Sequence, residues 1–450
     1  MVISMKRVLL TLMAFLMLVM TINSLTFAAE GIDVQITDAL GDKPMTTENV
    51  KHKHIKSVTA ITEVFGDGQK VTAVAVECDK EIDNSKLTES TFSVNGRTIT
   101  KVYANTAAAK AALGVNGKYA IIELSTADEG ALTFVPIFGE TPKIAEAKVS
   151  VTQLGEIITT DGEKYTPDSN AVVNDQVINL VVDDFKQIEY KDPKTGKTLK
   201  YNLFVPNNYD KNKSYPMVLF IHDAGVTSTE TKATLIQGLG AVIWATPSEQ
   251  AKHECFVLAP QYASATVNDN SETTDDLDTT VSLINSLESQ YKIDKNRLYT
   301  TGQSMGCMSS IALNIKYPNL FAASLLVAGQ WDPTVVAPLV KDKLWIIVSE
   351  GDVKAFPGMN AITATLEKAG AKISRATWNG QLSAAEFASD VSKMIAEGKS
   401  IKYTVLKKGT VVPADQIDDG GNNHRYTWRI AYTIEGVRDW LFTQERSPKL

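Results

Sequence analysis

Cysteine is scarce in this sequence, which has three cysteines in 450 residues. An odd number cannot pair completely within one chain. No group of cysteines has the spacing of a zinc site, and no metal or other cofactor is expected. Two interpretations stay open for Cys255 and Cys307: a bridge between them, or two buried thiols that act as small apolar side chains.

Positive charge is also limited. The chain has 45 Lys and Arg against 52 Asp and Glu, a net charge of −7, and it contains no long basic run. This balance argues against nucleic acid or an anionic surface as a partner. Association into a homo-oligomer is left open.

Only one run is apolar enough to suggest a membrane or a targeting segment. Residues 8–22 form this run, which follows Lys6 and Arg7 and precedes a small-residue cleavage pattern at 26–28. Spanning a bilayer takes about 20 apolar residues, so residues 1–28 are predicted to be a signal peptide rather than an uncleaved anchor. The mature chain is then expected to be secreted and extracellular, with no stable membrane span.

Residues 29–184 carry short alternating or β-branched runs separated by turn signals such as Asn95-Gly96 and Asp161-Gly162. Many short strands at this spacing predict an all-β, immunoglobulin-like sandwich domain. The runs are residues 70–77, 91–94, 119–124 and 177–182.

From residue 185 to residue 450, apolar strand-like runs alternate with helical stretches. This alternation predicts an α/β domain with a doubly wound, mainly parallel sheet covered on both faces. Residues 275–291, for example, place Leu277, Val281, Ile284 and Leu287 on one face of a helix.

Residues 297–308 contain Gly302-x-Ser304-x-Gly306 between a strand-like run and a helix-compatible run. This is the pattern of a nucleophile elbow in an α/β-hydrolase, where a sharp turn presents a serine hydroxyl at a helix N-terminus. The motif alone occurs by chance in roughly one chain in ten of this length. Its context therefore has to decide whether it is functional.

Histidine supplies that context, because a serine nucleophile needs a base and the chain has five histidines. The α/β-hydrolase order is serine, acid, histidine, and only His424 follows Ser304. We expect the acid just past the buried strand 344–349, where Asp352 is the preferred candidate and Glu350 the weaker one. The remaining histidines all precede the serine: His52, His54, His222 and His253.

The oxyanion hole is expected to use the backbone N–H of Met305, directly after the nucleophile, and a second N–H from the loop after strand 215–221. Ala224 is assigned as this second donor. His222, at the end of that strand, is interpreted as a residue that orients the loop. The alternatives are a second base and a place in the substrate pocket.

The chain resembles secreted bacterial α/β-hydrolase esterases with an immunoglobulin-like N-terminal domain, related to polyhydroxybutyrate depolymerase-like and feruloyl-esterase-like hydrolases. The resemblance rests on the segments 215–225, 293–306, 317–323 and 440–442. It implies an esterase that acts on small-molecule or polymer-linked esters. Two departures from the family pattern are Asp223, where the usual His-Gly pair has glycine, and Cys307, which replaces a frequent glycine.

Around the expected site, residues 379–400 are interpreted either as a small cap over the acyl site or as an ordinary surface helix. Trp331 and Phe356 each follow a strand end, so each is a candidate pocket residue or simply core. The segment 418–424 is predicted to be a glycine-rich loop that presents His424.

Together these features predict a secreted serine esterase that acts through Ser304, His424 and Asp352. Two alternative functions are left open. One is a serine peptidase of prolyl-oligopeptidase-like type, although no propeller precedes the catalytic domain. The other is a carbohydrate- or cell-surface-binding protein with an inactive hydrolase domain, against which the ordered triad argues.

Overall fold

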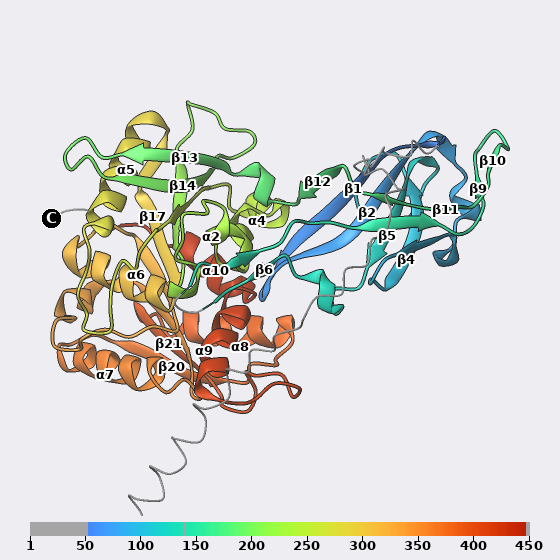
Figure 1. Cartoon of the computed structure of the whole chain (residues 1–450). Coiled ribbons are helices and arrows are strands. Elements are labelled where there is room, and N and C mark those ends of the chain that lie inside the picture. Colours follow the sequence, from blue (N-terminus) through green and yellow to red (C-terminus); the bar gives the residue numbers. More distant parts are fainter. Residues whose placement is uncertain (1–52, 138–139, 447–450) are drawn as a thin grey trace, which may run out of the picture. The chain divides into compact units, whose positions relative to one another are not determined.

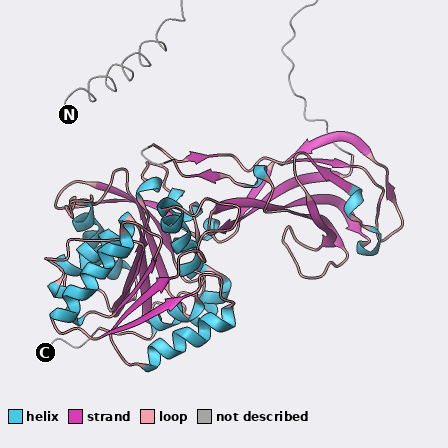
Figure 2. Cartoon of the chain, turned by 90° about the horizontal axis from the view of Figure 1, so that it is seen from below, coloured by secondary structure: helices cyan, strands magenta, loops and turns pink. Residues whose placement is uncertain are grey.

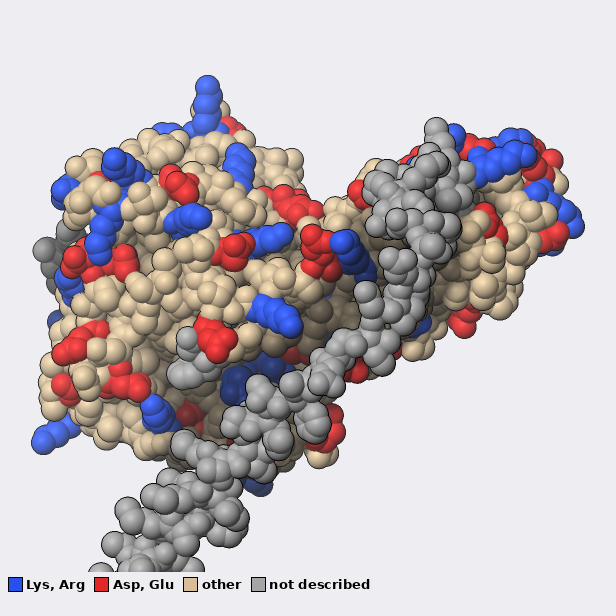
Figure 3. Space-filling model, in the orientation of Figure 1, with Lys and Arg blue, Asp and Glu red and all other residues tan. Residues whose placement is uncertain are grey.

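A computed structural model describes residues 53–137 and 140–446. The predicted signal peptide, residues 1–28, and His52 lie outside these described residues. Within them, no helix has the length and apolar character needed to cross a membrane. On the face shown in Figure 3, Lys and Arg are interspersed with Asp and Glu, so no large area of one charge sign is seen there.

The N-terminal domain is built from two packed sheets (Figures 1 and 2). Val74, Val76 and Ile122 from one sheet and Phe92 and Val151 from the other fill a common core. The larger sheet has the order β12-β1-β2-β5-β4, with bounds Gln176–Asn179, Ile55–Phe65, Gly68–Ile82, Gly117–Leu124 and Ile99–Asn105. The smaller has the order β11-β8-β3, with bounds Asp168–Val173, Ser150–Gln153 and Phe92–Val94. The predicted immunoglobulin-like sandwich is therefore confirmed.

Two short pairs of strands complete this β-rich part of the chain. They are β6 (Phe134–Val135) with β7 (Lys143–Ile144), and β9 (Ile157–Ile158) with β10 (Lys164–Tyr165).

The C-terminal domain is organised around a nine-stranded sheet in which one strand, β14, runs antiparallel to both its neighbours, β13 and β16. Every later neighbouring pair is parallel, which confirms the predicted mainly parallel sheet. The order is β13 (Lys186–Lys191), β14 (Thr198–Phe204), β16 (Phe256–Gln261), β15 (Tyr215–Ile221), β17 (Ile293–Gln303), β18 (Ala323–Val327), β19 (Leu344–Ser349), β21 (Ile401–Leu406) and β20 (Ile373–Trp378).

Helices cover both faces of this sheet (Figure 2). On one face α5 (Asp276–Gln290), α6 (Met305–Lys316) and α7 (Ala355–Lys368) bury their apolar sides in one core cluster, which includes the four residues predicted for α5. On the other face a second cluster contains side chains of five further helices. Those helices are α2 (Ala233–Ile236), α3 (Leu239–Val242), α8 (Ala384–Ala396), α9 (Gly420–Ala431) and α10 (Glu435–Phe442). The short helix α4 (Pro247–Lys252) buries Glu249.

The segment interpreted as a cap or a surface helix contains α8. Its residues Phe387, Val391 and Met394 are buried in the second core cluster. No residue of α8 lines either cavity that contains Ser304. This placement matches the surface-helix interpretation. The segment between β20 and His424 is long because it also contains β21, a strand that was not predicted from the sequence.

Candidate active site

The backbone turns sharply at Ser304, and this turn requires the two flanking glycines, Gly302 and Gly306. Strand β17 ends at Gln303, Ser304 adopts φ 53° and ψ −118°, and α6 begins at Met305. A positive φ is uncommon outside glycine, so the surrounding structure has to hold it. A Cβ on Gly306 would lie 1.9 Å from the carbonyl oxygen of Ile221, and one on Gly302 would lie 2.4 Å from the carbonyl carbon of Gly306. Only glycine lets the turn approach β15 this closely.

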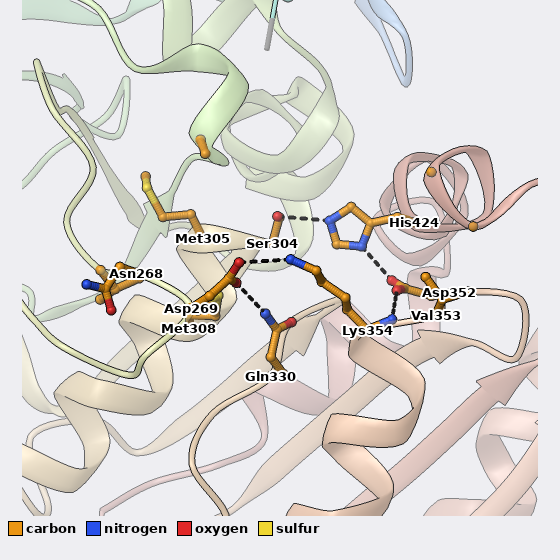
Figure 4. A pocket seen from close by; sticks show the side chains of 14 residues that line it. Asn268, Asp269, Ser304, Met305, Met308, Gln330, Asp352, Val353, Lys354 and His424 are labelled. Carbon is orange, nitrogen blue, oxygen red and sulfur yellow. Dashed lines mark hydrogen bonds and ion pairs between the residues drawn. The ribbon is translucent and has the colours of Figure 1, made fainter. Parts of the chain in front are cut away.

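Three predicted residues form one chain of hydrogen bonds (Figure 4). Ser304 Oγ lies 2.9 Å from His424 Nε2, and His424 Nδ1 lies 2.5 Å from Asp352 Oδ2. With Nδ1–H donating to the carboxylate, Nε2 is free to accept the serine proton. Ser304 follows β17, Asp352 follows β19 and His424 lies on the helix after β21, so the carboxyl ends of parallel strands in one sheet bring them together.

Asp352 is 2% exposed and follows β19 directly. Burial disfavours its charged form, but the hydrogen bond and charge of His424 and the amides of Ala355 and Lys354 hold its pKa below the usual value. These amides donate to Oδ1 at 2.9 and 3.0 Å, so both carboxylate oxygens are occupied. The weaker candidate, Glu350, instead accepts from the amide of Lys408.

His424 lies in the first turns of α9, so the prediction that a glycine-rich loop presents it is wrong in part. Asp419 caps the helix by accepting a hydrogen bond from the amide of Asn422 at 2.7 Å, which allows a helix to begin at Gly420. The His424 ring also packs edge-on against Trp428, with centroids 5.1 Å apart.

Asn423 and Ser349 support the site, and the sequence reading missed both. Ser349 Oγ donates to Asn423 Oδ1 at 2.8 Å, which ties the end of β19 to α9. A Cβ on Gly351 would lie 2.2 Å from Asn423 Oδ1, so glycine is needed where α9 approaches the Asp352 loop. The Gly351 next to the acid was the one available signal of this close contact.

The two proposed oxyanion donors both border the cavity that contains Ser304. Within the described residues, the amides of Ala224 and Met305 donate no hydrogen bond, so both remain available to a ligand. Asp223 fixes the Ala224 loop: its Oδ1 accepts from the amide of Gly225 at 2.9 Å, and its Oδ2 accepts from Gln303 Nε2 at 2.9 Å. The carboxylate that departs from the family pattern thus joins this loop to the residue before the nucleophile.

His222 is fully buried and does not line either cavity that contains Ser304, so its alternative place in the pocket is wrong. Its Nε2 accepts from the amide of Tyr262 at 3.0 Å, and its Nδ1–H donates to the carbonyl of Asp223 at 2.8 Å. Burial lowers its pKa, in keeping with this neutral form. The imidazole joins the end of β15 to the end of β16.

The larger cavity at Ser304 has a volume of about 520 Å³. Val267, Met305 and Met308 give it an apolar wall, and Lys354 lies at its polar side (Figure 4). There Asp269 accepts hydrogen bonds from Lys354 Nζ at 2.8 Å and from Gln330 Nε2 at 3.0 Å.

The predicted pocket aromatics do not line this cavity or the smaller one beside it. Trp331 is 7% exposed within the core on the α5–α7 face, and Phe356 packs against the same core. Both lie past strand ends as expected, but the Trp331 ring is buried in this core and the Phe356 ring packs against it, because contact between apolar side chains is favourable.

The three cysteines are free and buried, so the bridge considered for Cys255 and Cys307 is not formed in this structure. Burial raises the pKa of the Cys255 thiol to about 12 and also raises that of Cys307, which disfavours the reactive thiolate. Among the described residues, no group of His, Cys, Asp and Glu has the arrangement of a metal site.

Comparisons with known proteins agree with this architecture. Residues 57–166 match a family described as the esterase Ig-like N-terminal domain, and residues 193–397 match a family described as putative esterase. No curated protein matches the chain significantly.

Two solved structures illustrate the range of similarity. A protein described as a thermostable esterase is 31% identical, with a TM-score of 0.75, over 87% of this chain and 100% of its own. The feruloyl esterase module from Clostridium thermocellum is 15% identical, with a TM-score of 0.35, over 56% of this chain and 88% of its own. The chain therefore belongs to the esterase family in which an immunoglobulin-like domain precedes an α/β-hydrolase domain, and it is a carboxylic ester hydrolase.

Proposed function

We propose that this hydrolase acts through an acyl-enzyme on Ser304. The observation that carries the proposal is the unbroken hydrogen-bond chain from Ser304 Oγ through His424 to Asp352. His424 Nε2 accepts the serine proton as Oγ attacks the ester carbonyl, and Asp352 stabilises the imidazolium. The amides of Ala224 and Met305 bind the oxyanion, with each donor contributing about 3 kcal/mol.

The cycle closes with the same groups. His424 gives its proton to the leaving alcohol, which breaks the carbonyl–alkoxy bond and leaves the acyl group on Ser304. Water then loses a proton to His424 and attacks the acyl carbonyl. The second tetrahedral intermediate releases the carboxylic acid, and the proton returns to Ser304 Oγ.

Hydrolysis of short p-nitrophenyl acyl esters by the full chain tests the proposal. Ser304→Ala is expected to lower kcat by at least about 10³-fold, because the attacking oxygen is removed. Ser289→Ala, an exposed serine on α5, is the matched control and should leave kcat unchanged. Full activity in Ser304→Ala would overturn the acyl-enzyme.

The same assay separates esters from peptides. With matched p-nitrophenyl esters and p-nitroanilides, an esterase should show turnover of the ester only. Preferred turnover of the anilide would favour the peptidase alternative, and inactivity toward both would favour the binding-protein alternative.

We also propose that the protein is secreted, with residues 1–28 as the signal peptide. The support is the sequence pattern of that segment. N-terminal sequencing of the protein from the culture medium should give a start near Ala29. Retention of the whole N-terminus in a membrane fraction would overturn the proposal.

A further inference from the structure

A second cavity, with a volume of about 300 Å³, shares Ala224, Ser304 and His424 with the first. It extends along α9, where Arg425 and Arg429 line it. Its other walls come from residues far apart in the sequence: Asp67, Phe134, Asp223 and Gln237 among them.

Two residues that line this cavity each have a buried hydrogen-bond donor without a partner in the described part of the chain. Gln237 is 8% exposed, and its Nε2 has no hydrogen-bond partner within the described residues, although its Oε1 accepts from Gln303. The Nε of Arg429 is likewise buried and unpartnered there. The Arg429 guanidinium lies 4.1 Å from the ring centroid of Tyr426, and neither Arg425 nor Arg429 forms an ion pair within residues 53–137 and 140–446. Arg425 and Arg429 thus line the cavity without an acidic partner, and such guanidinium groups favour a ligand that supplies oxygen atoms.

The acidic groups of the cavity are already engaged. Asp223 accepts from Gly225 and Gln303 through its two oxygens, and Asp67 forms an ion pair with Lys70 at 2.8 Å. The cavity therefore offers free donors and occupied acceptors. A carboxylate matches this excess, since it accepts several hydrogen bonds and pairs with guanidinium groups.

The two cavities suit different halves of an ester. The apolar wall of the first, formed by Val267, Met305 and Met308, suits an acyl chain. The second follows the helix of His424, the group that must protonate the leaving alcohol. We propose that the second cavity binds the alcohol half and selects alcohols that carry a carboxylate. This inference rests on the proposed function, because it takes Ser304 as the point where the two halves meet.

The test compares kcat/KM for 4-carboxyphenyl acetate with that for its neutral analogue of similar size, 4-carbamoylphenyl acetate. The ratio of the two kcat/KM values is compared between variants, which cancels the difference in intrinsic reactivity between the two esters. Arg429→Gln should lower the wild-type preference for the carboxylate about tenfold, or about 1.4 kcal/mol. Arg425→Gln, at an exposed position, should lower it by a smaller factor. Arg375→Gln, whose arginine pairs with Glu367 on an exposed surface, is the matched control and should leave the ratio unchanged.

An unchanged ratio in both Arg425→Gln and a folded Arg429→Gln would overturn the inference. If Arg429→Gln does not fold, Gln237→Leu replaces it, with the same expected loss of preference. A second pair, phenyl hydrogen succinate and phenyl butyrate, places the carboxylate on the acyl half. If the arginine variants lowered the carboxylate preference only in this second pair, the assignment of the second cavity to the alcohol half would be overturned. Since the neutral esters report Ser304-dependent turnover separately, failure of this inference is distinguishable from failure of the proposed function.

Discussion

The carboxylate of Asp352 shows how single residues of the site depend on their surroundings. Burial alone would raise its pKa, whereas His424 and two backbone amides stabilise the charged form and leave the pKa below its usual value. An ionised Asp352 thus favours the folded state. This contribution is complete above the unfolded-state pKa of about 3.9 and is lost as the pH falls through the lower, folded-state pKa.

Asp352→Asn is therefore expected to flatten the acid side of the stability profile. Between about pH 4 and pH 2, the free energy of unfolding should fall less steeply in this variant than in the wild type, because one linked proton is removed. Urea unfolding at a series of pH values measures both slopes. Equal slopes would show that Asp352 has the same pKa in the folded and unfolded states.

At the scale of elements, α9 carries the base and depends on a local cap. Its first residues are Gly420 and Gly421, which are poor helix formers. The helix nevertheless begins there because Asp419 accepts from the amide of Asn422, and Ser349 holds Asn423 at the end of β19. The position of His424 thus relies on one side-chain cap and one contact with the sheet.

Asp419→Ala should remove this cap. We expect the free energy of unfolding to fall by about 1 kcal/mol. We also expect kcat to fall more than KM changes, because fraying of the first turn displaces the base His424 while the apolar wall of Val267, Met305 and Met308 stays in place. Chemical unfolding and steady-state kinetics measure the two effects. Asp419→Asn keeps an acceptor oxygen and is the control, so an equal loss in both variants would contradict the capping role.

At the scale of the whole molecule, a buried ion pair joins α4 to the C-terminal helix α10. Arg438 Nη2 lies 2.6 Å from Glu249 Oε1, and these side chains are 6% and 4% exposed. Arg438 also donates to the carbonyl of Tyr432 at 2.5 Å, next to the end of α9. The pair therefore links segments that lie almost 190 residues apart in the sequence.

Arg438→Met should lower the free energy of unfolding by about 3 kcal/mol, because it removes the buried partner charge of Glu249 and leaves only Lys252, whose Nζ lies 3.9 Å from Glu249 Oε1. The double variant Glu249→Met/Arg438→Met should recover part of this loss. Lys393→Met, which breaks an exposed pair with Asp390, is the control and should cost less than about 1 kcal/mol. Thermal and urea unfolding of the four proteins give the comparison, and a loss as small as that of the control would contradict a buried-charge penalty.

Much of the fold and part of the site could be predicted from local patterns. Short strand-like runs with turn signals predicted the fold class of the first domain, and alternation of strand and helix runs predicted that of the second. The order of Ser304, Asp352 and His424 predicted three side chains that the structure brings together. Prediction failed where packing decides. Trp331 entered the core and Phe356 packs against it, so neither lines the cavity at Ser304.

The sequence by itself determined which types of side chain form the site and their order along the chain. Turn glycines, periodicity and the scarcity of histidine suffice for this, because they are local or countable properties. Only the tertiary structure decided how α9 is capped and held, which donors of Gln237 and Arg429 stay unpartnered, and which groups meet around the second cavity. The physical reason is that burial and hydrogen-bond satisfaction depend on neighbours contributed by distant segments.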